Sequence, residues 1–192
     1  MFRTLVPVVV AGALAFGLGI WTADRATAEF RGFGSLGVDG WVAYPSVGTR
    51  DADAYARAHV ARAGEIPLSS AEGLAFIRSI DDDGAALDAD CSYDVEGQIL
   101  NARAWLLSAA PVGPDGADGP PSSIANSYTT AFERDGSFSI RLAKTLTDKN
   151  WGKTPVGPTF ALTLTMLDTT VGTAGGISIP SLPSIRKGDC DG

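Results

Sequence analysis

A strict alternation of side-chain type between residues 91 and 99 constrains this chain more than any other feature. The apolar positions are Cys91, Tyr93, Val95 and Ile99, and the polar positions between them are Ser92, Asp94, Glu96 and Gln98. Successive side chains of a β-strand point to opposite faces of its sheet, so this period of two predicts a half-buried strand. We expect this strand to lie at the centre of a sheet.

Similar patterns recur along the chain and predict further strands. These segments are 74–80, 102–107, 127–133, 137–142 and 159–166. We expect 102–107 to pair with the 91–99 strand, 41–44 to form a short edge strand or docking segment, and the proline-rich 180–186 to form no regular element. One polar face per strand is typical of antiparallel sheets. The chain is therefore predicted to be all-β, a mostly antiparallel β-sandwich or jelly roll.

One soluble helix is predicted at 51–63, before the strands. Asp51 is a plausible N-cap, Asp53 and Arg57 are spaced to pair, and Gly64 can end the helix. His59 is the single histidine of the chain. We expect a partly exposed helix histidine rather than a catalytic base, because spacing ties no nucleophile or acidic partner to it.

The stretch Thr4–Ala23 carries no charged residue. At about 1.5 Å per residue such a helix spans roughly 30 Å, the thickness of a bilayer core, which predicts a transmembrane anchor. The alternative is a signal peptide cleaved after Ala28, at the Ala26–Ala28 site. Against cleavage, the apolar run is longer than the about 7–15 residues of a usual signal-peptide hydrophobic region. Residues 1–28 are thus anchor or signal peptide, 29–50 a glycine-rich tether with a short strand, and 51–192 the β-sandwich domain with its leading helix.

The chain contains two cysteines, Cys91 and Cys190. Both interpretations of the N-terminus place the domain outside the cytoplasm, where disulfides form, so we predict a bond between the two. A zinc site that adds His59 would need three distant pieces to converge. No metal site and no cofactor are expected.

Charge and short motifs exclude several classes of function. The net charge of −7 argues against a nucleic-acid partner. The G-x-G-x-x-G match at 32–37 follows an apolar span rather than a strand, so it does not indicate dinucleotide binding. Aspartates 81–83, 88 and 90 lie close in sequence but lack the spacing of a calcium loop; a solvated turn is expected, and calcium binding there stays open.

Two groups of residues are candidates for a functional site. Asp94 and Glu96 share the polar face of one strand, about 7 Å apart, a separation that suits carboxylate chemistry such as glycoside hydrolysis. Arg103 with Trp105, and Trp151 in a predicted loop, could form a polar and aromatic contact site. The alternative is structural: acidic residues on a solvated strand face, Trp105 in the core and Trp151 at the end of the sandwich.

Several short pieces resemble, in order and spacing, the domain of unknown function 1214 family, in particular its short membrane-anchored members. They include Gly40–Pro45, Asp51–Arg57, Gly64–Leu68, Glu72–Phe76, Cys91–Tyr93, Ala102–Trp105, Asp135–Phe138, Asn150–Trp151 and Leu182–Ile185. The resemblance implies a domain similar to the C-terminal jelly-roll part of larger two-domain proteins, and it supplies no activity, cofactor or catalytic residue. The chain departs from the family pattern after Trp105 and after Trp151.

We therefore expect a single-pass protein of a bacterial-type cell membrane, with its domain on the periplasmic or extracellular side. The membrane is the expected partner of the N-terminal helix, and an envelope protein is a further one. A binding or scaffold module is favoured over an enzyme. The alternative is a carboxylate-based hydrolase that acts on a glycan or related envelope substrate.

Overall fold

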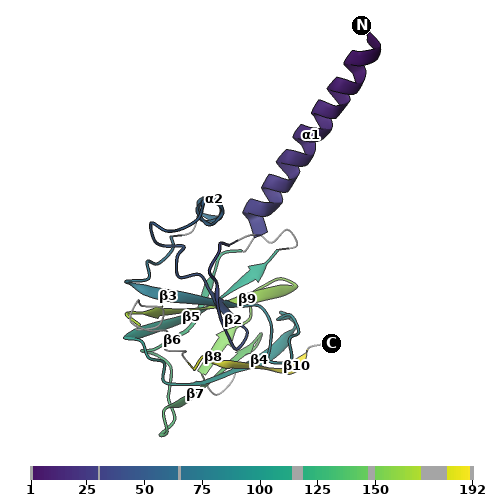
Figure 1. Ribbon diagram of the computed structural model, residues 1–192. Coiled ribbons are helices and arrows are strands. Elements are labelled where there is room, and N and C mark those ends of the chain that lie inside the picture. Colours follow the sequence, from purple (N-terminus) through teal and green to yellow (C-terminus); the bar gives the residue numbers. More distant parts are fainter. Residues whose placement is uncertain are drawn as a thin grey trace.

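Two β-sheets and two helices make up the computed structural model, which describes residues 2–29, 31–64, 66–113, 119–146, 150–169 and 181–190. The larger sheet has six strands in the order β1-β2-β3-β9-β5-β6, and the smaller has four in the order β10-β4-β7-β8. Helix α1 leaves the sheets as a long rod, and α2 lies beside its base (Figure 1). The fold is all-β apart from the helices, as predicted.

The elements follow one another along the chain with these bounds. They are α1 Phe2–Glu29, β1 Leu36–Val38, β2 Trp41–Ala43, α2 Ala54–Ala63, β3 Gly73–Arg78, β4 Cys91–Gln98, β5 Ala104–Val112, β6 Ser122–Asn126, β7 Ser137–Ala143, β8 Asn150–Lys153, β9 Thr159–Leu167 and β10 Ser184–Cys190. Strands β7 and β8 pair in parallel. The other neighbouring strands pair antiparallel.

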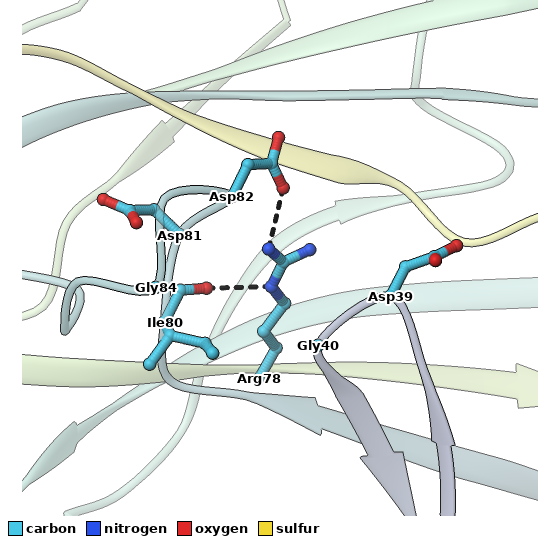
Figure 2. A pocket seen from close by; sticks show the side chains of 7 residues that line it. All are labelled: Asp39, Gly40, Arg78, Ile80, Asp81, Asp82 and Gly84. Atoms are coloured by element: carbon cyan, nitrogen blue, oxygen red, sulfur yellow. Dashed lines mark hydrogen bonds and ion pairs between the residues drawn. The ribbon is translucent and has the colours of Figure 1, made fainter.

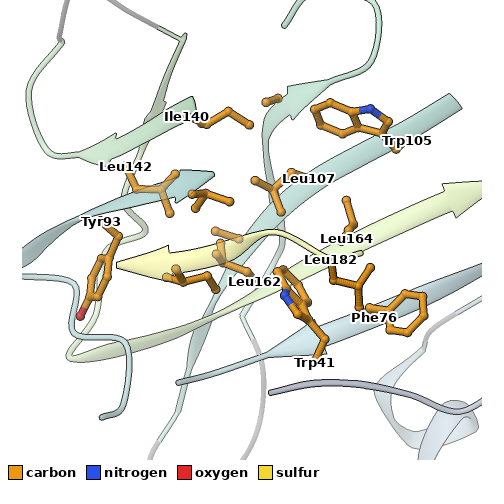
Figure 3. Packing of buried hydrophobic residues seen from close by; sticks show 14 of the residues in the cluster. Trp41, Phe76, Tyr93, Trp105, Leu107, Ile140, Leu142, Leu162, Leu164 and Leu182 are labelled. Carbon is orange, nitrogen blue, oxygen red and sulfur yellow. The ribbon is translucent and has the colours of Figure 1, made fainter. Parts of the chain in front are cut away.

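The core lies between the two sheets and is built from the apolar positions of the alternating strands (Figure 3). In β4, Cys91, Tyr93 and Val95 are buried, and this strand lies inside the smaller sheet between β10 and β7. In β9 the residues Phe160, Leu162, Leu164 and Met166 are at most 1% exposed. The prediction for Ile99 was wrong: β4 ends at Gln98, and the Ile99 side chain is 67% exposed.

Strand β5 does not pair with β4, contrary to prediction. It lies in the larger sheet between β9 and β6. The chain makes a tight turn after β4, where the Ala102 N–H donates to the Leu100 carbonyl over 2.8 Å. The Arg103 N–H then donates to the Leu167 carbonyl over 3.0 Å, which starts the ladder with β9. Alternation identifies a strand but does not identify its partner, because both sheets of a sandwich follow the same pattern.

The strand predicted at 127–133 was also wrong, since β6 comes earlier, at Ser122–Asn126. Asn126 ends the strand: its side-chain oxygen accepts from the N–H groups of Tyr128 and Thr129 at 2.9 and 3.1 Å. An asparagine that bonds the backbone two residues on favours a turn over an extended chain. The alternation of Tyr128, Thr130 and Phe132 is therefore not the pattern of a strand.

The C-terminal segment forms strand β10, where no regular element was expected. Ile185 lies opposite Val95 of β4 and is fully buried. The indole N–H of buried Trp41 donates to the Pro183 carbonyl over 2.8 Å, and the disulfide Cys91–Cys190 joins the far end of β10 to β4. The predicted disulfide is present. Its partner strand was missed because these tertiary contacts outweigh the low strand propensity of a proline-rich segment.

The segment before α2 is part of the larger sheet. β1 and β2 form a hairpin, so β2 is the second strand of the sheet and β1, not the predicted 41–44 strand, forms the edge. Helix α2 begins after Asp53, whose carboxylate accepts from the N–H groups of Tyr55 and Ala56. Asp53, rather than Asp51, is therefore the N-cap. Gly64 ends α2 in the left-handed conformation, as predicted.

Candidate functional site

The two predicted carboxylates lie on the outer face of the smaller sheet, and each is bound to an arginine. Asp94 Oδ2 lies 2.5 Å from Arg141 Nη1, on the neighbouring strand β7. Glu96 forms an ion pair with Arg186 of β10, on the other side of β4. Register explains both pairs, since Asp94 lies opposite Arg141, and Glu96 lies diagonally across from Arg186. We call Ser92, Asp94, Glu96, Arg141 and Arg186 the outer-face network.

Arg141 lies at the centre of the outer-face network. Its Nη2 donates to Ser92 Oγ over 2.8 Å, and that hydroxyl donates to the Asp189 carbonyl over 3.0 Å. Gly188 of β10 passes directly over this pair: a Cβ there would lie 2.7 Å from Ser92 Oγ and 3.0 Å from Arg141 Nη2. A larger residue at this position would require the Ser92 hydroxyl or the Arg141 guanidinium to shift. The arrangement fixes the guanidinium in place, with its side chain 26% exposed.

The geometry of the network suits recognition better than acid–base chemistry. A glycosidase needs one carboxyl that gives up a proton and a second that attacks or activates water, both free to reach the substrate. Here each carboxylate is paired with an arginine, so neither is free to reach a substrate. Arginine side chains are the groups that proteins commonly use to bind planar anions and polar surfaces.

The aromatic and basic candidates do not converge with one another. Trp105 is 4% exposed and stacks on Phe138, with ring centroids 5.4 Å apart, so it belongs to the core. Arg103 precedes β5 in the larger sheet, and its 76% exposed side chain lies 3.4 Å from Asp168. Trp151 does lie near the outer-face network, since it is opposite Arg141 in the β7–β8 pair. It is half-buried, and its indole N–H is buried without a hydrogen-bond partner.

A hollow of about 320 Å³ lies elsewhere, at the end of β3, and the sequence did not predict it. Figure 2 shows its lining residues, which are Asp39, Gly40, Arg78, Ile80, Asp81, Asp82 and Gly84. The sequence signal was Arg78, a charged residue in the otherwise uncharged strand β3.

Arg78 is 4% exposed and forms the floor of this hollow. Its Nε donates to the Ile80 carbonyl over 2.8 Å, and its Nη2 donates to Asp82 Oδ1 over 2.7 Å (Figure 2). The β1–β2 turn packs against the guanidinium: Gly40 has φ 80°, and a Cβ there would lie 3.0 Å from Arg78 Nε. Asp82 Oδ1 also accepts from the Ile185 N–H over 3.0 Å. Arg78 and Asp82 thus connect the β3 end of the larger sheet to β10.

The aspartates near this hollow have separate structural roles. Asp81, 2% exposed, accepts the N–H groups of Asp83 and Ala85 through Oδ1, at 3.0 and 2.9 Å. Asp90 pairs with Lys144 at 2.7 Å. Burial raises the pKa of the nearby Tyr93 hydroxyl, and the charges of Asp81 and Asp88 add to the rise. Within the described ranges, no group of three or more histidine, cysteine or acidic residues is placed to hold a metal ion.

The junction of the two helices brings a predicted residue into contact with α1. His59 is buried, at 9% exposed, which corrects the partly exposed position expected for it. Its Nδ1 lies 3.2 Å from the Thr27 carbonyl oxygen, and its Nε2 is buried without a partner. The zinc alternative is also wrong, because the sulfurs of Cys91 and Cys190 are bonded to each other.

A family model described as "Protein of unknown function (DUF1214)" matches residues 72–171. No curated protein matches. Among solved structures, the VPA0106 protein from Vibrio parahaemolyticus aligns with a TM-score of 0.51 at 16% identity, over 72% of this chain and 36% of that one. A putative uncharacterized protein from Burkholderia cenocepacia aligns with a TM-score of 0.44 at 16% identity, over 65% of this chain and 31% of that one. The chain thus spans about a third of the length of these structures, and the likeness to the Vibrio protein concerns the fold alone.

Proposed function

This chain belongs to the DUF1214 family of proteins of unknown function, and we propose that it is a membrane-anchored binding or scaffold module of the cell envelope. In this proposal α1 crosses a bacterial-type membrane once. The β-sandwich stands on the periplasmic or extracellular side, where its outer faces meet envelope partners.

The observation that carries the proposal is the exposure of the apolar part of α1. Within the stretch Val6–Thr27 of α1, an 18-residue window has a mean hydropathy of 1.9, and none of that window is buried inside the described chain. Val8, Phe16 and Ile20 are 70, 77 and 69% exposed. Burial of apolar surface is worth about 25 cal/mol per Å², so this much of it in water would be strongly unfavourable. A bilayer supplies the missing apolar surroundings.

Contacts at the end of α1 support a retained anchor over a cleaved signal peptide. The Ala26–Ala28 stretch lies inside α1, not in an extended segment. Thr27, the middle residue of that stretch, contacts His59 through its carbonyl and Arg62 through its hydroxyl. Cleavage after Ala28 would remove both contacts from α2.

The disulfide supports placement of the domain outside the cytoplasm. Cys91 and Cys190 are bonded over a sequence separation of 99 residues. Such bonds persist in oxidising compartments and are rare where thiols are kept reduced.

The outer-face network supports recognition as the activity of the domain. Arg141 and Arg186 are held by carboxylates, and their side chains remain 26 and 61% exposed, so their remaining surface can meet a partner. A fixed guanidinium loses little freedom when it binds, which favours its use in recognition.

The anchor is tested with two matched substitutions in the full chain, Leu14→Arg and Leu146→Arg. Leu14 lies in the middle of the apolar stretch, and Leu146 is a 78% exposed residue after β7. An arginine at the centre of a bilayer is unfavourable by about 2.5–3.5 kcal/mol on insertion scales. We expect Leu14→Arg to shift protein from the membrane pellet to the supernatant after alkaline extraction, and Leu146→Arg to leave it in the pellet. A wild-type chain that is soluble with Glu29 as its first residue would overturn the anchor.

The oxidising environment of the domain is tested by counting free thiols on protein taken from its native compartment. Wild-type protein that has been denatured without reductant should expose no free thiol. Two free thiols per chain in material from the native compartment would overturn the disulfide and remove its support for a domain outside the cytoplasm.

A further inference from the structure

Helix α2 lies beside the base of α1, at the level where the membrane must end (Figure 1). The uncharged run Thr4–Ala23 fills the roughly 30 Å of a bilayer core, and Asp24 is the first charged residue after it. Arg62 of α2 binds Asp24, with Nη2 and Oδ1 2.6 Å apart. Helix α2 therefore lies at headgroup depth, if α1 spans as proposed.

At the N-terminal end of α2 one carboxylate binds the backbone of two residues whose aromatic side chains are exposed. Asp53 Oδ2 accepts from the Phe33 N–H over 3.2 Å, and Asp53 Oδ1 accepts from the Tyr55 N–H over 2.8 Å. The side chains of Phe33 and Tyr55 are 65 and 48% exposed. Aromatic residues are enriched at membrane–water interfaces, where one end of the ring is in an apolar medium and the other is hydrated.

The charge of α2 differs from that of the whole chain. Its sequence AYARAHVARA contains two arginines and no acidic residue, while the full chain has a net charge of −7. Arg57 and Arg62 are both exposed. Basic residues close to a membrane are attracted by anionic lipid headgroups, and each such residue contributes about 1 kcal/mol to binding.

We infer that Phe33, Tyr55, Arg57 and Arg62 form a second membrane contact, the α2 foot, which binds anionic lipid headgroups in the leaflet from which the domain emerges. The aromatic residues enter the interface, and Arg57, together with the exposed part of Arg62 that does not face Asp24, binds lipid phosphates. The contact would fix the orientation of the sandwich, which one helix alone leaves free to rotate. The inference rests on the proposed span of α1, but not on which side of the membrane the domain occupies.

The test places a photoreactive benzoylphenylalanine at position 55 of the full chain. The protein is reconstituted in vesicles of phosphatidylcholine, with or without added phosphatidylglycerol. Tyr128 supplies the matched control: it is a tyrosine, 83% exposed, and follows β6 at the edge of the larger sheet opposite to β1. We expect lipid adducts at position 55, with an excess on phosphatidylglycerol, and no lipid adducts at position 128.

A second variant tests the role of the arginines. The combined substitution Arg57→Gln and Arg62→Gln should remove the excess of phosphatidylglycerol adducts at position 55, and the chain should remain in the membrane pellet. No lipid adducts at position 55, or equal yields with both lipids, would overturn the α2 foot. If the chain also leaves the pellet on alkaline extraction, the proposed anchor fails instead, so the two failures are distinguishable.

Discussion

Arg141 of β7 lies opposite Asp94 of β4, and their side chains meet 2.5 Å apart on the outer face of the smaller sheet. The same arginine also binds Ser92, beneath Gly188 of β10. Arg141 thus binds two residues of the neighbouring strand β4 from outside the core, and the Ser92 hydroxyl continues the connection to β10. Arg186, which pairs with Glu96, is more exposed, at 61%.

We expect these two arginines to differ in their effect on stability. Arg141→Ala should lower the free energy of unfolding by about 1 kcal/mol, because it breaks a half-exposed ion pair and a hydrogen bond together. Arg186→Ala should lower it by about 0–0.5 kcal/mol, as is usual for exposed pairs. Thermal unfolding of the full chain in detergent measures both. A larger loss for Arg186→Ala would contradict this assignment.

Trp41→Phe should destabilise the domain by about 1–3 kcal/mol, because it leaves the buried Pro183 carbonyl without its donor. Trp21→Phe is the control: that residue lies in the apolar span of α1, 60% exposed, and should leave the melting temperature of the sandwich unchanged. Equal melting temperatures for the two variants would mean that Trp41 does not hold the C-terminal segment.

Loss of the disulfide should destabilise the domain strongly. On the chain-entropy model, closing a loop of about 100 residues stabilises the folded state by roughly 4–5 kcal/mol. Reductant should therefore lower the melting temperature of the wild-type chain to that of the double variant Cys91→Ser and Cys190→Ser. The double variant itself should not respond to reductant. A wild-type chain that melts at the same temperature with and without reductant would argue against the bond.

The cap of α2 predicts a dependence on acid pH. Hydrogen bonds, first of all from the Ala56 N–H, hold the pKa of Asp53 below its ordinary value of 3.8. A carboxyl whose pKa is lower in the folded state contributes stability that is full above the unfolded pKa and is lost as pH falls through the folded one. Asp53→Asn, which can still cap the helix, should remove this acid-side loss from the pH profile of melting temperature.

Asp51→Asn is the matched control for that experiment, since Asp51 lies two residues before the observed cap and was the cap predicted from sequence. It should leave the acid limb of the profile unchanged. If Asp51→Asn flattened the limb and Asp53→Asn did not, α2 would begin where the sequence pattern placed it.

The sequence predicted the strands whose alternation is driven by burial on one face. In β4, β7 and β9, apolar and polar positions follow the two faces of the sheet, because one face meets the core and the other meets solvent. In the turn before β7, Gly136 adopts φ 83°, a left-handed conformation that glycine accepts readily. Local pattern was enough for these elements.

The missed elements depend on contacts between distant parts of the chain. β10 forms because Trp41, Asp82 and Cys91 hold it from three separate segments. The assignment of β5 to the larger sheet depends on a turn at residues 100–103, which alternation does not report. Predictions from sequence alone lack these long-range terms.

The candidate site also combines features that the local sequence pattern predicts with features that depend on contacts between distant segments. Sequence placed Asp94 and Glu96 correctly on one polar strand face, but their arginine partners come from β7 and β10, so their pairing could not be read from β4. Trp105 and Trp151 look alike in sequence, yet one stacks in the core and the other lies opposite Arg141 at the outer face. Arg78 and the hollow above it were missed because the Asp39–Gly40 turn reaches them from another hairpin.

β10 is the last strand in chain order and is the neighbour of β4, with Cys190 following Cys91 by 99 residues. During synthesis β4 is therefore made long before one of its two partner strands exists, and Cys91 remains a thiol until Cys190 follows. Until β10 arrives, one edge of β4 is open to pairing with another chain. The smaller sheet must close after the larger one has its strands, so a stalled or shortened chain would present an open edge and a reactive sulfur together, the combination that leads to cross-linked aggregates.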